Sequence, residues 1–420
     1  MPITQEELGR RLRVAREACR MTQDDVGRQL ELSRSTIAQI ELGKRTVSGL
    51  ELGKLAYLFG RDMRGFVEDR FEEEDALLAL FRSHPEISDQ DDIVAALRLC
   101  VTLGRELTNL ERLLAIDRDI GTIAAYPLAQ PKTKWEAIQQ GERIAEEERR
   151  RLGLGSVALP CVAELLETQG VRTAQVSLPD DVSGLTLVEE DIGFFVVANR
   201  EHHVLRRRFS YAHEYGHVLM DRGRRGAVSR SRDRDDQLEM RANAFAASLL
   251  MPAAGVRQFI HALGKGRPSR FQAEVFDESD ALRVEGRSRP GSQDIQIYDV
   301  VLMAQHFGAS RLAALYRLRN LRLITEKQLD ALKSREDAGA GQEMARMLDL
   351  PEQDHRAARN EFRRRFLGLA LEAYRREEIT HSKLLELAAM VEVARREVES
   401  ALRDLGIEDD SGADVILPEV

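Results

Sequence analysis

The spacing of hydrophobic positions divides the chain into helical and strand-forming regions. Across residues 4–60, apolar side chains such as Leu8 and Leu12 recur every three or four positions, which predicts several short amphipathic helices. Thr22 and Ser33 stand before two of these segments, and their hydroxyls are typical N-caps because they accept hydrogen bonds from the first turn. The region therefore predicts a bundle of short helices.

A longer helical pattern runs from residue 68 to residue 120, with a break near Pro85. Its second half carries an apolar stripe with three-or-four spacing, formed by Ala96, Leu99, Leu103, Leu107, Leu110 and Leu114. Such a stripe must be buried. The core of the same chain and the seam of a homodimer would both bury it, and we predict a homodimer.

The hydrophobic pattern then changes along the middle of the chain. Two helical segments are followed by three β-rich runs and two more helical segments, at residues 134–152, 159–169, 171–177, 185–188, 194–199, 208–220 and 238–251. Residues 264–294 are rich in Gly, Ser, Pro and Arg, which predicts a loop. Most of the remaining chain is helical. The fold class predicted is therefore a multidomain, mainly α protein, with a central α+β domain that contains a small sheet.

Composition excludes several classes of protein. The 420 residues are 43% hydrophobic, which is too apolar for a disordered chain, and no run approaches the length of a membrane helix. The three cysteines are widely spaced and form neither a disulfide framework nor a CxxC metal pair. The N-terminal residues are acidic and polar, unlike a secretory signal. We expect a cytoplasmic protein with no membrane partner.

Charge is unevenly distributed. The net charge of -9 argues against a nucleic-acid partner, but the first 60 residues contain ten basic and eight acidic side chains. Residues 222–234 contain six arginines. This segment could bind nucleic acid or an acidic substrate, and a solvated loop is the simpler interpretation.

Residues 22–45 have the layout of a helix-turn-helix. Arg34, Ser35 and Gln39 would lie on the exposed face of the second helix, and Arg and Gln are the side chains that pair with guanine and adenine edges. The run from Leu8 to Phe59 resembles the Xre/lambda-repressor family of helix-turn-helix domains, with five helices. The resemblance implies that the domain binds double-stranded DNA.

By the same resemblance, Gln23 and Lys44 would contact backbone phosphates, while Arg34, Ser35 and Gln39 would contact bases. Glu31 stands where the family usually has a turn glycine, so the turn could be altered. The alternative is a helix-turn-helix that makes only protein contacts.

A His-Glu-x-x-His segment carries the candidate chemistry. His213 and His217 are four residues apart in a helical run, so both imidazoles can reach one zinc ion, and Glu214 can act as a general base. Glu239 opens the next helical run and is the best third ligand. Asn243 shares its face and could hydrogen-bond a ligand histidine. Asp221 is a weaker ligand candidate.

These segments resemble the ImmA/IrrE family of zinc metallopeptidase domains, over roughly residues 132–325. The motif Arg208-Phe209-Ser210-Tyr211-Ala212-His213-Glu214-Tyr215-Gly216-His217 and the run from Glu239 to Pro252 carry the resemblance. It implies a zincin-like fold, one Zn²⁺ per chain held by His213, His217 and Glu239, and Glu214 as the catalytic residue. It also implies a bacterial protein and control of Xre-type repressors in stress or mobile-element responses.

Four segments are predicted: a DNA-binding domain (1–66), a helical connector with a possible dimer contact (67–131), a metallopeptidase domain (132–335) and a helical segment with an acidic tail (336–420). The function predicted is a DNA-binding regulator whose zinc endopeptidase cleaves a regulatory protein, either an Xre-type repressor or the chain itself. Two alternatives stay open. The zinc domain could be a sensor or structural module without turnover, or the chain could be the antitoxin-like partner of a neighbouring gene product.

Overall fold

The structure is a computed structural model. It describes residues 3–19, 21–59, 61, 63–67, 91–116, 123–189, 192–222, 226–230, 236–265, 270–276, 281–287, 293–351 and 361–404. The predicted helical segment before residue 91, its break near Pro85 and the acidic tail lie outside these residues. Within the described ranges, no helix is both long and apolar enough to cross a membrane.

The N-terminal region forms five helices, as the sequence predicts: α1 (Gln5–Ala18), α2 (Gln23–Leu30), α3 (Arg34–Glu41), α4 (Gly49–Leu58) and α5 (Met63–Val67). Thr22 and Ser33 cap α2 and α3, each accepting a hydrogen bond from a backbone amide in the first turn. Leu12 and other apolar residues on the inner faces of these helices form a separate hydrophobic core. Glu31 ends α2 with a left-handed φ of 57°, in the place where a glycine is the more usual residue.

The central sheet has four strands: β1 (Arg172–Val176), β2 (Val182–Glu189), β3 (Gly193–Asn199) and β4 (Gly226–Arg230). Their order is β1-β3-β2-β4, with β1 parallel to β3 and the other neighbours antiparallel. Because side chains alternate between faces, Val196 packs into one hydrophobic cluster and Val197 into another. The sheet is therefore covered on both faces.

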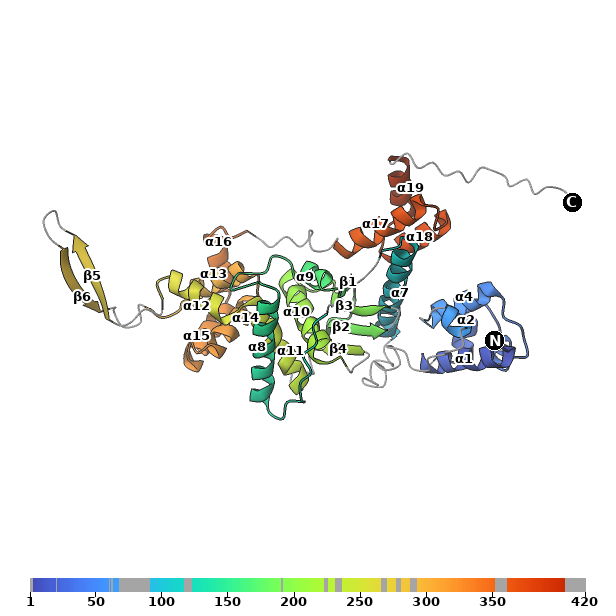
Figure 1. The fold of residues 1–420 in the computed structure, drawn as a ribbon, viewed down its shortest axis with the longest axis horizontal. Helices are drawn as coiled ribbons and strands as arrows, with labels where there is room; N and C mark the ends of the chain where they lie inside the picture. Colours follow the sequence, from blue (N-terminus) through green and yellow to red (C-terminus); the bar gives the residue numbers. More distant parts are fainter. Residues whose placement is uncertain are drawn as a thin grey trace.

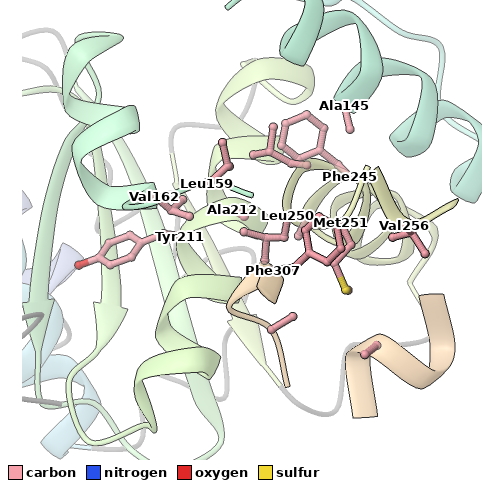
Figure 2. Packing of buried hydrophobic residues seen from close by; sticks show 14 of the residues in the cluster. Ala145, Leu159, Val162, Tyr211, Ala212, Phe245, Leu250, Met251, Val256 and Phe307 are labelled. Carbon is pink, nitrogen blue, oxygen red and sulfur yellow. The ribbon is translucent and has the colours of Figure 1, made fainter. Parts of the chain in front are cut away.

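Helices α8 (Lys134–Arg151), α9 (Val162–Thr168), α10 (Val204–Met220) and α11 (Gln237–Leu250) lie on one side of the sheet (Figure 1). The chain then continues through α12 (Ala253–Ala262), α13 (Ile297–Phe307), α14 (Arg311–Asn320), α15 (Glu326–Asp337) and α16 (Ala340–Met347). Figure 2 shows side chains from these elements, including Tyr211, Phe245 and Phe307, in one continuous core. This core fixes α10 and α11 against each other.

The opposite face of the sheet is covered by α7 (Asp91–Leu113) and α17 (Glu361–Arg375), and α18 (His381–Met390) and α19 (Arg395–Asp404) pack beyond these two helices (Figure 1). The predicted apolar stripe lies here: Leu103, Leu107, Leu110 and Leu114 are buried, and Ala96 and Leu99 are partly buried. Glu111 bonds to Arg172 of β1 at 2.6 Å and to Arg365 of α17 at 2.9 Å. The stripe is thus buried by the chain's own sheet and C-terminal helices.

Two loop predictions are wrong. Residues 264–294 contain an antiparallel hairpin of β5 (Arg270–Phe276) and β6 (Ala281–Arg287), in which Val275 is opposite Leu282. Its apolar residues alternate with charged ones, so a composition rich in Arg and Ser conceals the period of two. Within residues 222–234, β4 pairs with β2, so this part of the arginine-rich segment is an edge strand instead of a solvated loop.

Candidate metal centre

The His-Glu-x-x-His segment lies on α10, at the place where this helix packs against α11. A Cβ at Gly216 would come within 3.0 Å of the Phe245 ring of α11, so the absence of a side chain permits the close approach of the two helices. Asp236 caps α11 by accepting hydrogen bonds from the amides of Leu238 and Glu239. The cap places Glu239 in the first turn of α11, opposite the two histidines of α10.

Three ligand-type atoms converge between these helices. The Nε2 atom of His213 is 3.1 Å from Glu239 Oε2 and 3.2 Å from the Nε2 atom of His217, which is itself 3.2 Å from Glu239 Oε1. Ligand atoms bound to a tetrahedral zinc at about 2.0–2.1 Å are separated by about 3.3 Å. Within the described ranges, these residues are the one group of His, Cys, Asp or Glu side chains close enough to share a metal ion.

The other ring nitrogen of each histidine faces an oxygen acceptor. His213 Nδ1 lies 3.0 Å from Asn243 Oδ1, and His217 Nδ1 lies 2.8 Å from Asp221 Oδ2. A carbonyl or carboxylate oxygen can only accept, so each Nδ1 carries the proton and donates it. Each Nε2 atom is then left to bind a metal ion in the space that it shares with the Glu239 carboxylate, which is the arrangement that second-sphere partners impose on metal-binding histidines.

The negative charge around His217 also fits a cation. Burial opposes protonation of this ring, but Asp221 and Glu239 outweigh it and raise the pKa of His217 to about 10. Burial likewise opposes ionisation of Glu239, yet its hydrogen bonds with the two histidines hold its pKa below the usual value. A buried group of side chains that attracts positive charge in this way suits a divalent metal ion, and the donor set of two imidazoles and one carboxylate suits Zn²⁺.

Glu214 is fully buried beside this group. Its Oε2 atom accepts a hydrogen bond of 2.7 Å from the Thr186 hydroxyl of β2, while Oε1 has no hydrogen-bond partner among the described residues. A Cβ at Gly184 of β2 would lie 3.1 Å from Oε1 and 2.9 Å from a backbone oxygen of β3, so glycine provides the space for this carboxylate. One oxygen is thus fixed, and the other, within the part of the chain that the structure describes, keeps its capacity to accept a hydrogen bond.

The residues predicted to contact DNA have different surroundings. Arg34, Ser35 and Gln39 are exposed along α3, and Lys44 is exposed just beyond it. Gln23 is half-buried, and its amide donates a 2.8 Å hydrogen bond to Glu41, which also pairs with Arg16 of α1. In this structure Gln23 therefore connects α2 to α3.

Residues 7–64 match a family model described as a helix-turn-helix domain, and residues 167–276 match the IrrE N-terminal-like domain of the M78 peptidases. The chain contains a helix-turn-helix domain and an IrrE-like domain. Both resemblances predicted from the sequence are confirmed, and the IrrE-like domain indicates a regulator with a metallopeptidase-type domain. No curated protein matches the chain. The exact limits of the four predicted segments stay predictions.

The contacts of two residues in the IrrE-like domain were not predicted from the sequence. Asp221, considered as a ligand, instead accepts the hydrogen bond of His217 Nδ1 and pairs with the buried Arg241. Thr186 holds Glu214 from a strand that lies 28 residues earlier in the chain. The pattern of four-residue spacing on α10 could have indicated Asp221, which follows His217 by one helical turn, but no local signal indicates Thr186.

Proposed function

We propose that this chain is a DNA-binding regulator whose IrrE-like domain is a zinc-dependent endopeptidase. One observation carries the proposal: the Nε2 atoms of His213 and His217 and the carboxylate of Glu239 converge next to Glu214, which keeps one oxygen without a partner. A purely structural zinc site has four protein ligands and has no need of a buried carboxylate in addition to them.

His213, His217 and Glu239 would hold one Zn²⁺ per chain. When bound, the ion supplies Lewis-acid chemistry, acidifying a water molecule and polarising a peptide carbonyl. Glu214 Oε1 takes the proton of the attacking water and delivers it to the amine that leaves, while the Thr186 hydroxyl keeps the carboxylate in position. Asn243 and Asp221 orient the two imidazoles.

The substrate proposed is a regulatory protein, either an Xre-type repressor or this chain itself, in a stress or mobile-element response. The helix-turn-helix domain would bring the peptidase to double-stranded DNA, where such repressors are bound. Arg34, Ser35 and Gln39 would contact bases, and Gln23 and Lys44 would contact phosphates. A homodimer would contact two half-sites one helical turn apart.

The decisive experiment compares wild-type protein with Glu214→Gln, both loaded with zinc, on candidate repressors and on the chain alone. The substitution keeps the size and the Thr186 contact but removes the proton acceptor, so we expect cleavage to fall at least 100-fold with zinc content unchanged. Glu201→Gln, an exposed carboxylate in the same domain, is the matched control. Equal cleavage by wild type and Glu214→Gln would refute the peptidase role.

The DNA-binding role is tested separately, on an operator selected from random sequence with the wild-type protein. Arg34→Ala combined with Gln39→Ala should weaken operator binding at least 10-fold, because each lost base contact costs about 1–3 kcal/mol. The exposed residue Arg28 lies on α2, and Arg28→Ala should have a smaller effect. Undiminished binding by the double variant would exclude this assignment of base contacts.

Burial of the candidate centre favours a second function. Glu214, His213 and His217 are all buried, as expected for a sensor or structural module that binds metal without turnover. In that case Glu214→Gln would leave regulation in cells intact, whereas chelation of zinc would abolish it. A peptidase would lose regulation in both experiments.

A further inference from the structure

A cavity of about 760 Å³ lies on the side of the sheet that faces the C-terminal helices. Its walls come from α7, the end of β1, the segment between β3 and α10, α17 and the turn after α18. Its volume is within the range of about 300–1,000 Å³ typical of small-molecule sites. None of the residues around the candidate metal centre lines it, so it is separate from the proposed peptidase site.

One wall of the cavity is apolar. Ala96, Leu99 and Leu103 line it from α7, and Phe362 and Val391 line it from the C-terminal helices. These residues belong to the hydrophobic cluster that joins α7 and the C-terminal helices to the sheet, or pack against it. Since transfer of apolar surface out of water is favourable by about 25 cal/mol per Å², this wall suits the hydrophobic body of a ligand.

The other side of the cavity is polar and contains an ion pair. Arg200 Nη1 bonds to Glu392 Oε2 at 2.8 Å, and its Nη2 bonds to Glu392 Oε1 at 2.5 Å and to the Ser177 hydroxyl at 2.7 Å. The guanidinium group therefore already holds a carboxylate in the fork geometry that it prefers. The Arg200 side chain is 26% exposed and that of Glu392 is 65% exposed, so Glu392 can return to water at little cost when another carboxylate replaces it.

We propose that this cavity binds a small-molecule carboxylate with an apolar body, and that the carboxylate of the ligand replaces Glu392 on Arg200. The apolar body lies along α7, Phe362 and Val391. A second cation, Arg363, lines the same cavity and lies 3.9 Å from Glu397. Glu201 also lines it, 3.7 Å from Arg200, and is 53% exposed. Once Glu392 is displaced, the two arginines of the lining outnumber this one carboxylate, which favours an anionic head group.

Arg200 connects this cavity to two other parts of the protein. Glu392 lies in the turn after α18, and its ion pair with Arg200, the residue that follows β3, connects the C-terminal helices to the sheet. The backbone oxygen of Arg200 accepts a 2.9 Å hydrogen bond from Arg207 of α10, the helix that carries the candidate metal centre. A ligand that displaces Glu392 breaks the ion pair between Arg200 and Glu392, as expected for the effector of a regulator.

The test uses the full-length chain and isothermal titration with octanoate as the probe. Its uncharged and cationic counterparts, 1-octanol and octylamine, have the same apolar body. Of the three, only octanoate can replace the Glu392 carboxylate on Arg200 with a carboxylate of its own. Octanoate should therefore bind at least 10-fold more tightly than either counterpart. Arg200→Gln should remove this preference, whereas Glu392→Gln should raise the affinity for octanoate several-fold because the competing carboxylate is gone.

Two further variants locate the site. Ala96→Trp fills the cavity from α7 and should abolish binding of octanoate and 1-octanol alike. Arg375→Gln breaks an exposed Arg–Glu pair on α17 that does not line the cavity, and it should leave every affinity unchanged. The proposal is overturned if octanoate does not bind the wild-type chain, if Ala96→Trp binds it normally, or if Glu392→Gln binds it no better than wild type.

Discussion

Replacement of Asp221 by Asn tests whether the hydrogen bonds behind the candidate metal centre set its affinity. Asp221 accepts from His217 Nδ1 through one oxygen and from Arg241 through the other, and both of these partners are buried. An Asn at this position keeps one acceptor oxygen and replaces the other with an NH₂ group. The amide can satisfy either His217 or Arg241, but not both, because the NH₂ group cannot accept a hydrogen bond.

The expected loss follows from these contacts. Without its acceptor, the ring of His217 is free to rotate or to change tautomer, and its Nε2 lone pair is less often directed toward the metal position. Loss of such outer partners weakens metal binding by about 10–100-fold, which corresponds to about 1.4–2.7 kcal/mol. The loss should also lower stability, because Arg241 would keep a buried charge without its carboxylate.

The assay is a competition titration of zinc against a chelating indicator, accompanied by thermal unfolding of the zinc-free chain. Asp299→Asn is the matched control: Asp299 is also buried and pairs with a cation, Lys265 at 3.4 Å, but it lies away from the candidate centre. The control should lose stability and retain its zinc affinity. If Asp221→Asn binds zinc within twofold of wild type, the orienting role of Asp221 is wrong.

Three other substitutions test separate parts of the fold. Glu31→Gly should raise the free energy of unfolding by about 0.5–1 kcal/mol in urea titrations, because glycine adopts the left-handed C-cap of α2 without strain; a decrease would contradict this. Burial opposes ionisation of Glu148, but Arg151 and two tyrosine hydroxyls keep its pKa below the usual 4.5. The ionised Glu148 therefore stabilises the folded state above pH 4.5, and this stabilisation is lost as the pH falls through the lower pKa of the folded state. Melting temperatures measured between pH 3 and 6 should therefore fall more steeply for wild type than for Glu148→Gln. Glu111→Ala leaves the buried Arg172 without its carboxylate and should cost about 3–5 kcal/mol in urea unfolding. A cost below about 1 kcal/mol would show that this ion pair does not hold α7 to the sheet.

Local patterns account for the parts of the structure that could be predicted from the sequence. The caps at Thr22 and Ser33 act over three residues, and the spacing of His213 and His217 places both on one helix face whatever surrounds the helix. Glu239 could be selected because it opens the next helical run. In each case the deciding interaction is set by helix geometry, which sequence alone conveys.

Interactions across the sheet were beyond prediction because they depend on which strand lies next to which helix. The contact of Thr186 with Glu214 requires that β2 cross over α10 in one register, since a shift by one residue would turn the Thr186 side chain to the other face. The edge strand β4 and the β5–β6 hairpin were missed for a related reason. Both segments are short and rich in Gly, Ser or Arg, which is the composition of loops, and pairing, which is not local, decides between strand and loop.

The apolar stripe of α7 shows how such a pairing changes a functional interpretation. From the sequence, the stripe fits a dimer seam as well as a core, because periodicity specifies that a face is buried and not what buries it. In the structure, Leu103 and Leu107 pack with residues of β3 and α17, and Glu111 bonds to both the sheet and α17. The stripe therefore needs no second chain, and a dimer, if the regulator forms one, must use another surface. The same packing places the 760 Å³ cavity between α7 and the C-terminal helices, so these two segments, separated by about 250 residues, form one ligand-sized site together.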